Sequence, residues 1–402
     1  MALRAVPRAV DATMELTRLT LTDFRSYARA ELTPHPGLTV IAGPNGTGKT
    51  NLLEAIHATI VGRSHRAGVD ADLVRHGTPF ARIQLELAGG TESGGSAIEL
   101  VLPGVEPTPG IRKRLMVNGV PRRTSALTEI ARAVLFRPEE MLLLVGAPSE
   151  RRRFLDGIVA QRDRRAARDL VDVARVVTQR NALLRAIRAD EASIDTLGFW
   201  DEQLAQLGAR VMRARLEVMG EMATRIGPLH DAVATDRERG ASVELIYQDA
   251  LKEAWPQRDA AGRRSPTDVE LADAYRRRIA DVRQKEAWNG VSLVGPQRDD
   301  LRAALGGRDV AGHASRGQQR TIILAMKLAE TDLLGADGPR PIVLLDDVFS
   351  ELDPDRAGRL SALLADRGQV VVTTADPGTL ESARRRRAAV WHIDRGRLVQ
   401  EP

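Results

Sequence analysis

The chain has 402 residues, of which 43% are apolar and 28% charged, and these proportions exclude an intrinsically disordered protein. It contains no cysteine, which excludes disulfide bonds, cysteine-ligated clusters and thiol catalysis. The 59 lysines and arginines outnumber the 54 acidic residues, and this net charge of +5 is compatible with nucleic-acid binding but does not establish it.

The sequence carries no recognisable membrane or export signal. No apolar run approaches the about 20 residues that a membrane span needs, and the N-terminus lacks the apolar core of a secretory signal. We therefore expect a cytoplasmic protein without a membrane partner. Residues 1–13 precede Met14 as an extension, which is either a flexible arm or a mis-assigned start.

The first third of the chain has the pattern of strands around one helix. Apolar residues alternate over residues 15–21, and a short β-branched run covers residues 39–42. A glycine-rich turn and an apolar helix at residues 51–61 follow. Residues 81–87 and 97–102 alternate again, which predicts two further strands joined by a turn.

From about residue 148 the apolar residues recur at helical spacing. Two long amphipathic helices with a break near residues 195–198 predict a helical hairpin. Residues 255–270 are polar and rich in turn formers, which predicts a loop, and residues 268–288 predict another helix. The apolar pattern is too short for an extended coiled coil.

After residue 290 the strand patterns return, at residues 291–294, 342–345 and 369–373, with a hairpin near the C-terminus. The α/β segments at both ends predict one domain that is assembled from two parts of the chain, with a helical insertion between them. The expected divisions are an extension at residues 1–13, the first part of the α/β domain at 14–147, the helical insertion at 148–290 and the second part of the α/β domain at 291–402.

Residues 43–50 carry a phosphate-binding motif. They read GPNGTGKT, which matches G-x-x-x-x-G-K-[ST], and they follow an apolar strand and open a helix as the motif requires. Backbone N–H groups and the helix N-terminus would cradle phosphates, Lys49 would contact the β/γ-phosphates and Thr50 would ligate Mg²⁺. The predicted ATP-binding residues are Gly43, Pro44, Asn45, Gly46, Thr47, Gly48, Lys49 and Thr50.

Two adjacent acids follow a buried strand at residues 341–353, which read PIVLLDDVFSELD. A carboxylate at the end of a strand beside a phosphate loop is where Mg²⁺ is held, so Asp346 and Thr50 are the predicted metal ligands. Asp347 would polarise the attacking water, which makes Asp347 and Lys49 the predicted catalytic residues. The alternative is an acidic cap where the strand passes into a turn.

A third motif stands between these two. Ser315 precedes an amphipathic helix, and Gly317 and Gln318 follow it directly. A small hydroxyl residue and a glycine at a helix N-terminus can bind an anion, but the same residues can also form a plain helix cap.

The order of phosphate loop, S-x-G-Q helix and acidic strand resembles the ABC-type ATPases of the SMC and RecF class. Only 264 residues separate Thr50 from Ser315, whereas SMC proteins insert a long coiled coil here, so the chain is most similar to the RecF family. The resemblance covers about residues 16–399. It rests also on LTDFRSY at residues 21–27, FRPEEMLLLVGAPSERRRFLD at 136–156, VGPQRDDL at 294–301 and DDVFSELD at 346–353.

The resemblance implies a fold and a mode of action. The fold is an α/β ABC-type P-loop ATPase head, a mixed sheet with flanking helices, plus a helical insertion domain. ATP and Mg²⁺ bind the head, and Ser315, Gly317 and Gln318 contact the ATP of a second subunit in trans. ATP thereby joins two copies into a head-to-tail homodimer. Arg25 is a further nucleotide contact by analogy with SMC-like heads, and the alternative for Arg25 is a structural salt bridge.

The same resemblance implies a biological role. RecF-like proteins are weak, DNA-stimulated ATPases that bind DNA in an ATP-dependent manner during recombinational repair of gapped or stalled replication forks. They work with RecO and RecR to load RecA on single-stranded DNA, and so support the SOS response. The implied partners are therefore DNA, RecO, RecR and a second copy of the chain.

Some residues depart from the wider ABC pattern. Asp347 stands where many ABC ATPases have glutamate, which would suit a slow switch. Thr373 and Thr374 end a strand where transporters place a histidine, and Gln297 stands where relatives often have histidine. No glutamine loop can be assigned, because Gln84 has the pattern of an ordinary strand residue.

DNA would be contacted by a basic segment. Residues 151–188 contain eleven arginines and four aspartates, and phosphate contacts from such a segment would weaken steeply with salt. The alternative is a solvated helix face with salt bridges. Aromatic residues make up only 3%, which favours recognition of duplex, gapped or junction DNA over base stacking with single strands. The predicted DNA contacts are Arg151, Arg152, Arg153, Arg164 and Arg165.

Three other function classes compete with this interpretation. A transporter ATPase subunit predicts a glutamine loop and a histidine switch, and the sequence has neither. A non-catalytic scaffold would bind ATP while Asp347 performs no chemistry. A metabolic P-loop kinase explains neither the S-x-G-Q helix nor the helical insertion.

Overall fold

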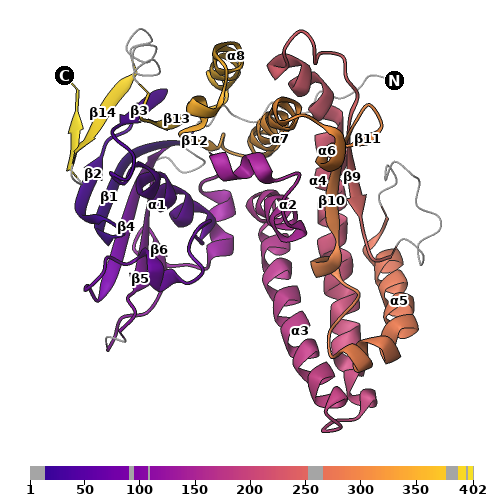
Figure 1. The fold of residues 1–402 in the computed structure, drawn as a ribbon. Helices are drawn as coiled ribbons and strands as arrows, with labels where there is room; N and C mark the ends of the chain where they lie inside the picture. The colour runs from indigo at the N-terminus through magenta and orange to yellow at the C-terminus, as the bar shows by residue number, and fades with distance from the viewer. Residues whose placement is uncertain are drawn as a thin grey trace, which may run out of the picture. The chain divides into compact units, whose positions relative to one another are not determined.

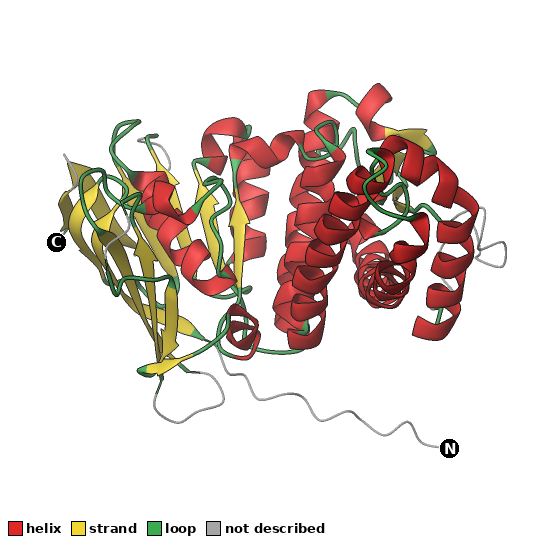
Figure 2. Ribbon diagram, turned by 90° about the horizontal axis from the view of Figure 1, so that it is seen from below, coloured by secondary structure: helices red, strands yellow, loops and turns green. Residues whose placement is uncertain are grey.

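The structure is a computed structural model that describes residues 14–89, 95–106, 109–251, 266–376, 388–394 and 397–401. The chain forms two compact units, one made of Met1–Glu140 and Glu330–Pro402 and the other of Met141–Ala329. Figure 2 shows that strands gather in the first unit and helices in the second. The extension at residues 1–13 and most of the loop at 255–270 lie outside the described residues, so these two expectations stay predictions.

The first unit contains an antiparallel sheet built from the N-terminal part of the chain (Figure 1). Leu16, Leu19, Leu21 and Phe24 are the buried residues of β1, and a register shift between Leu16 and Arg18 interrupts the alternation expected for a strand with one face on a core. The strand order is β2-β1-β4-β5-β6-β7. These strands are β1 (Glu15–Phe24), β2 (Tyr27–Leu32), β4 (Phe80–Ala88), β5 (Ser96–Pro103), β6 (Arg114–Val117) and β7 (Val120–Pro121).

The second sheet of this unit combines both ends of the chain in the order β15-β14-β3-β13-β12-β8. All neighbours in it are parallel except β14 and β15, which form the predicted C-terminal hairpin. Its central strands are apolar, as parallel strands covered on both faces require. The strands are β3 (Leu38–Ala42), β8 (Ala133–Phe136), β12 (Ile342–Asp346), β13 (Val370–Thr374), β14 (Ala389–Asp394) and β15 (Arg397–Gln400).

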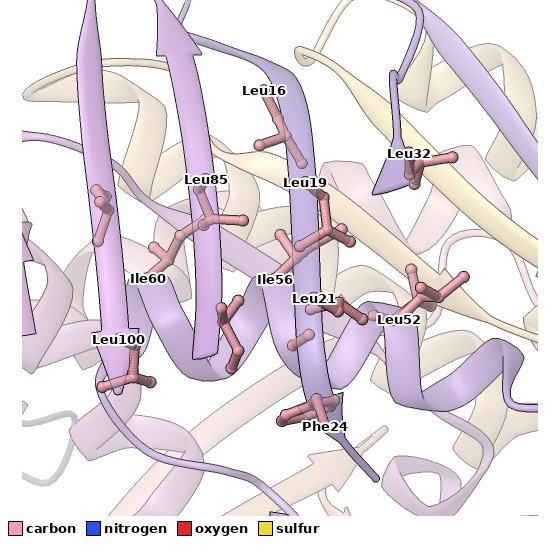
Figure 3. Packing of buried hydrophobic residues seen from close by; sticks show 14 of the residues in the cluster. Leu16, Leu19, Leu21, Phe24, Leu32, Leu52, Ile56, Ile60, Leu85 and Leu100 are labelled. Atoms are coloured by element: carbon pink, nitrogen blue, oxygen red, sulfur yellow. The ribbon is translucent and has the colours of Figure 1, made fainter. Parts of the chain in front are cut away.

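The core of the first unit lies between the antiparallel sheet and helix α1 (Lys49–Val61). Leu52, Ile56 and Ile60 recur on one face of this helix at spacings of four residues, and all are buried. Figure 3 shows them beneath Leu19 of β1 and Leu85 of β4. Helix α8 (Pro354–Leu364) belongs to the same unit. This packing fixes the start of α1, where the phosphate motif lies.

The second unit is mainly helical and contains the predicted hairpin. Asp163 caps α3, because its carboxylate accepts from the backbone N–H groups of Arg165 and Ala166, and this cap separates α2 from α3. A turn at Ile194–Leu197 joins α3 to α4, close to the expected break. The helices are α2 (Pro148–Arg162), α3 (Arg164–Arg188), α4 (Gly198–Val233), α5 (Asp268–Asn289), α6 (Val310–His313) and α7 (Arg316–Ala336), which extends past the unit boundary.

The second unit also holds a small antiparallel sheet that the sequence did not indicate. Strands β9 (Val243–Gln248), β10 (Asp300–Leu305) and β11 (Arg308–Asp309) pair in the order β11-β10-β9. Because β10 pairs with β9, residues after 290 join the helical unit, and the unit ends at 329 rather than at the expected 290. The predicted strand at residues 291–294 is wrong, since this segment is irregular and pairs with no strand.

The architecture agrees with the predicted class, an α/β head with a helical insertion. Among the described residues, no helix combines the length and apolarity needed to cross a membrane.

Candidate functional site

The phosphate motif forms the loop between β3 and α1 that its sequence predicts. Gly48 has φ 109°, a backbone conformation that favours glycine, and a Cβ here would lie 2.9 Å from the Tyr27 hydroxyl oxygen. That hydroxyl donates to the Gly48 carbonyl at 3.0 Å. The N–H of Gly43 donates to the carbonyl of Thr374 at 3.2 Å, which ties the loop to β13. The loop is therefore shaped by contacts outside the motif.

Lys49 lies inside the loop that it would serve. Its side chain is buried, and its Nζ donates to the carbonyls of Gly43 at 2.6 Å and Pro44 at 3.0 Å. Burial lowers the pKa of Lys49, and the nearby carboxylates of Asp347 and Asp346 oppose this effect. The ammonium group is thus held beside the two acids predicted to act with it.

The predicted metal ligands meet directly. The Thr50 hydroxyl donates to Oδ1 of Asp346 at 3.0 Å, although 296 residues separate them. Adjacent ligands of an octahedral Mg²⁺ lie about 3 Å apart when each is about 2.1 Å from the ion, so this pair fits the metal. Among the described residues, no cluster of three or more acidic, histidine or cysteine groups could hold a metal ion.

Asp347 follows Asp346 with a left-handed backbone, φ 49° and ψ 28°. This conformation is uncommon for a residue with a side chain and is often found at functional sites. Burial raises the pKa of Asp347, whereas Ser350 and Lys49 lower it. The structure thus brings Lys49, Thr50, Asp346 and Asp347 to one edge of the parallel sheet.

Thr373 completes this edge and was left without a role by the sequence. It is the register partner of Asp346 across β12 and β13 and is fully buried. Its hydroxyl donates to Asp346 Oδ1 at 2.7 Å and accepts from the Asp347 N–H at 3.1 Å. The only sign of this role in the sequence is that Thr373 ends a β-branched run. That its partner is Asp346 follows from the register of the two strands, which the sequence does not give.

Arg25 lies beside the loop in a buried ion pair. Its Nε and one terminal nitrogen donate to the two carboxylate oxygens of Glu54, each at 3.0 Å, and Glu54 is completely buried. Ser64 donates to the same carboxylate at 2.6 Å, and Arg66 approaches it to 3.8 Å. The observed partners therefore match the salt-bridge alternative for Arg25, while its predicted nucleotide contact stays a prediction. Glu54 could have been noticed as the one acid in the apolar run LLEAI.

Ser315, Gly317 and Gln318 belong to the second unit, at the start of α7. The Ser315 N–H donates to Oε1 of Gln318 at 2.9 Å, and the Gln318 N–H donates to the Ser315 hydroxyl oxygen at 3.2 Å. This reciprocal pair is a capping box. It leaves the Ser315 O–H and the Gln318 NH₂ as donors at an exposed helix start.

The five arginines predicted to contact DNA separate into two groups. Arg151 is buried, and its guanidinium bonds Asp300 at 2.7 and 2.9 Å, so we withdraw it as a DNA contact. Arg152 is half-buried and donates to the Asp299 carbonyl at 2.8 Å. Arg153, Arg164 and Arg165 are exposed. Arg180, which also belongs to the basic segment, is fully buried and bonds Glu286 and Asp201.

A second basic surface, which the sequence reasoning missed, lies on the hairpin of β6 and β7, hereafter the basic hairpin. Asn118 and Gly119 have positive φ and form its turn. The Arg122 N–H donates to the Leu115 carbonyl at 2.9 Å, so the chain stays paired with β6 directly after β7 ends. The exposed basic residues of this hairpin are Arg112, Lys113, Arg114, Arg122 and Arg123.

Two glutamines considered from the sequence have structural partners. Gln84 donates to Glu99 on the neighbouring strand at 3.1 Å, as an ordinary strand residue would. Gln297 donates to the Val294 carbonyl at 3.0 Å. Neither contact places these residues at the phosphate loop.

Comparisons with known proteins agree on one family. The profile described as "RecF/RecN/SMC N terminal domain" matches residues 15–396. A protein of Kineococcus radiotolerans named "DNA replication and repair protein RecF" is 39% identical over 383 residues, which cover 92% of this chain and 95% of that protein. A protein of the same name from Streptomyces avermitilis is 38% identical over 382 residues, 92% of this chain and 97% of the relative.

Solved structures give the same result for the fold. A structure titled "Structure of the recombination mediator protein RecF-ATP in RecFOR pathway" superposes with a TM-score of 0.83 at 25% identity, covering 99% of this chain and 100% of the other. An SMC head bound to the C-terminal winged-helix domain of ScpA has the related fold, with a TM-score of 0.53 at 15% identity and coverage of 96% and 97%. The chain belongs to the RecF family.

Proposed function

We propose that this protein is an ATP-controlled DNA-binding protein of recombinational repair. It binds ATP and Mg²⁺, hydrolyses ATP slowly when DNA is bound, and forms a head-to-tail dimer while ATP is present. With RecO and RecR it helps to load RecA on single-stranded DNA at gaps and stalled forks, and it supports the SOS response. The observation that supports this proposal most directly is the contact of Thr50 with Asp346 beside Lys49, in a chain of this family.

The phosphate loop supplies the binding step. Backbone N–H groups at the start of α1 and the positive end of its dipole hold the phosphates, and the Lys49 ammonium neutralises the charge on the β/γ-phosphates. Thr50 and Asp346 hold Mg²⁺, which when bound neutralises charge on the phosphoryl oxygens. Since these residues lie on α1 and on the ends of parallel strands, they are positioned by rigid elements.

Asp347 supplies the hydrolytic step. Its backbone is left-handed where the chain leaves β12, and its carboxylate would accept a hydrogen bond from the attacking water. An aspartate has a shorter reach than a glutamate, which suits a slow switch. The scaffold alternative is tested by D347N, which we expect to bind ATP normally and lose at least about 100-fold in turnover. Unchanged turnover would favour the scaffold.

The capping box supports a contact with the ATP of a second copy. Because Ser315 and Gln318 satisfy each other, their remaining donors are held in place before a phosphate arrives. Two such contacts across a dimer give ATP a differential affinity for the dimeric state, and this difference is what allows a nucleotide to shift the equilibrium.

The test measures mass by light scattering and DNA affinity on the same sample. Each sample contains no nucleotide, ADP or a non-hydrolysable ATP analogue with Mg²⁺. We expect dimerisation and tighter DNA binding with the analogue alone. S315R should abolish both, because a long cation replaces the small hydroxyl at the interface.

Q318E is the sharper variant. Glutamate keeps the acceptor that the capping box needs, but it removes the amide donors and adds a negative charge near the phosphates. We expect unchanged thermal stability and loss of the dimer. If Q318E still dimerises with the analogue, Gln318 acts only as a helix cap. If the wild-type protein stays monomeric with the analogue, the proposed ATP-driven dimer is wrong.

A further inference from the structure

The hydroxyl of Thr373 contacts both acids of the proposed ATP site. A hydroxyl has one hydrogen to donate and two lone pairs that accept. The Thr373 hydrogen has two acceptors in reach, Oδ1 of Asp346 at 2.7 Å and the Leu345 carbonyl at 3.4 Å. The shorter contact is to a carboxylate, and such charge-assisted bonds are the stronger ones.

The same oxygen also holds the backbone of the second acid. The Asp347 N–H donates to the Thr373 hydroxyl at 3.1 Å and lies 3.2 Å from the Thr373 carbonyl. Asp347 leaves the strand at this point with φ 49°. One side chain therefore contacts both acids, the carboxylate of Asp346 and the turn that presents Asp347.

The surroundings make this contact a rigid one. Thr373 is fully buried and Asp346 is only 7% exposed, so water cannot readily replace the hydroxyl. Oδ1 of Asp346 receives two hydroxyl donors, from Thr50 at 3.0 Å and from Thr373. If the Thr50 hydroxyl were to ligate Mg²⁺ instead, Thr373 would remain as the hydroxyl donor that fixes the orientation of Asp346.

We propose that Thr373 is a positioning residue for ATP hydrolysis, whose hydroxyl aligns Asp346 toward the metal and fixes the turn that carries Asp347. Outer-shell partners of metal ligands commonly change metal affinity or activity by about 10- to 100-fold when they are lost. The inference rests on the proposed ATP and Mg²⁺ site, and it adds a residue that acts through Asp346 and Asp347.

The test uses the full chain with T373V, which keeps the buried β-branched shape and removes the hydroxyl. A fluorescent ATP analogue is titrated in EDTA and at increasing Mg²⁺. We expect unchanged affinity in EDTA, and an about 10-fold or larger rise in the Mg²⁺ concentration needed for tight binding. Turnover should fall in parallel, and T373S should restore both.

T39V is the matched control. Thr39 is fully buried on β3 of the same sheet, and its hydroxyl accepts from the His35 N–H at 2.8 Å, away from the acids. It should leave the Mg²⁺ dependence unchanged. If T373V does not fold, the comparison of T373S with T373A carries the same test.

The outcomes are distinguishable. A T373V protein with the Mg²⁺ dependence of the wild type, or a T373S protein as defective as T373V, would overturn the positioning role alone. A wild-type protein whose ATP affinity does not respond to Mg²⁺ would overturn the proposed site and this inference with it.

Discussion

Two arginine–glutamate pairs in the first unit have similar N–O distances but differ in how far they are exposed to solvent. Arg25 reaches Glu54 at 3.0 Å, and the Glu54 side chain is 0% exposed. Arg18 reaches Glu31 at 2.9 Å, and both side chains are about half exposed. Surface pairs contribute little to stability, whereas removing one partner of a buried pair leaves an uncompensated charge.

Replacing Glu54 with glutamine should therefore destabilise the protein by about 3 kcal/mol, because the Arg25 guanidinium loses a buried counter-charge. Urea unfolding at neutral pH measures this free energy. The matched control E31Q should cost less than about 1 kcal/mol. Equal effects of the two variants would mean that burial does not govern these pairs.

The basic hairpin is a candidate DNA contact, and the salt dependence of DNA binding can test it. Each phosphate contact lowers the slope of log affinity against log salt by about 0.9 for duplex DNA. The double variant Arg122→Gln with Arg123→Gln should therefore weaken duplex binding and reduce the magnitude of the salt slope by up to about 2.

Two comparisons sharpen this measurement. R29E changes the net charge by the same amount at an exposed position of β2, and it should leave the slope nearly unchanged. Arg164→Gln with Arg165→Gln tests the exposed start of α3 in the same way. A hairpin variant that behaves like R29E would exclude the basic hairpin as a DNA contact.

A network of buried charged residues around Arg215 and Asp299 connects the helices of the second unit to its small sheet. Arg215 of α4 bonds Asp156 of α2 at 2.7 and 3.0 Å and lies 3.4 Å from Asp299. The Tyr247 hydroxyl of β9 donates to Asp299 at 2.5 Å. Burial is the largest influence on Asp299 and raises its pKa to about 6, although Arg215 and Tyr247 lower it.

The raised pKa of Asp299 predicts that the free energy of unfolding decreases as the pH rises. An acid whose pKa is higher in the folded state stabilises the fold below its unfolded pKa of about 4, and this contribution is lost as the pH rises through about 6. D299N cannot ionise, so between about pH 4 and 6 the wild type should lose up to about 1.4 kcal/mol per pH unit relative to D299N.

Urea unfolding across this pH range measures the difference. The control is E202Q, because a hydrogen bond from Arg276 lowers the pKa of Glu202 to about 2, and its effect should be constant above about pH 5. Parallel pH profiles of the wild type and D299N would contradict the predicted ionisation of Asp299.

The two units differ in the number of chain segments that form them. The second unit is one continuous segment, Met141–Ala329, whereas the first combines Met1–Glu140 with Glu330–Pro402. In the parallel sheet, β3 pairs with β13 on one side and β14 on the other, and β8 pairs with β12. The N-terminal strands of this sheet therefore have no partners without the C-terminal segment.

Fragments should reflect this connectivity. A fragment of residues 141–336, which keeps α7 whole, should fold alone and unfold cooperatively by circular dichroism. A fragment of residues 14–140 should bind ATP only after it is mixed with residues 330–402. ATP binding by residues 14–140 alone would show that the parallel sheet is not required for the site.

The sequence predicted those parts of the site that are local in the chain. The phosphate loop and the two acids follow from short motifs after apolar strands, and the structure brings them together. Glu54 and Thr373 could not be assigned, because their roles depend on partners that lie far away in the chain or on a neighbouring strand. Helical spacing also could not show that Arg151 pairs with Asp300, 149 residues away.

For the fold too, the sequence predicted local elements but not the partners that are distant in the chain. Amphipathic spacing located α3 and α4, and short apolar runs located β3, β12 and β13. The boundary near residue 290 failed because β9 and β10 pair across a helix and a loop. Such pairing is decided by packing in three dimensions, and the pattern of apolar residues within either strand does not identify its partner.

The place of β3 between β13 and β14 has a consequence for synthesis on the ribosome. Thr50 emerges early, but Asp346 follows 296 residues later, which is roughly 15 to 60 seconds of translation. During that interval the helical segment can complete its own contacts, while β3, which leads into the phosphate loop, lacks both of its partner strands. A nascent or truncated chain is thus unable to bind nucleotide through the assembled site, and so cannot act as a switch before its last strands are made.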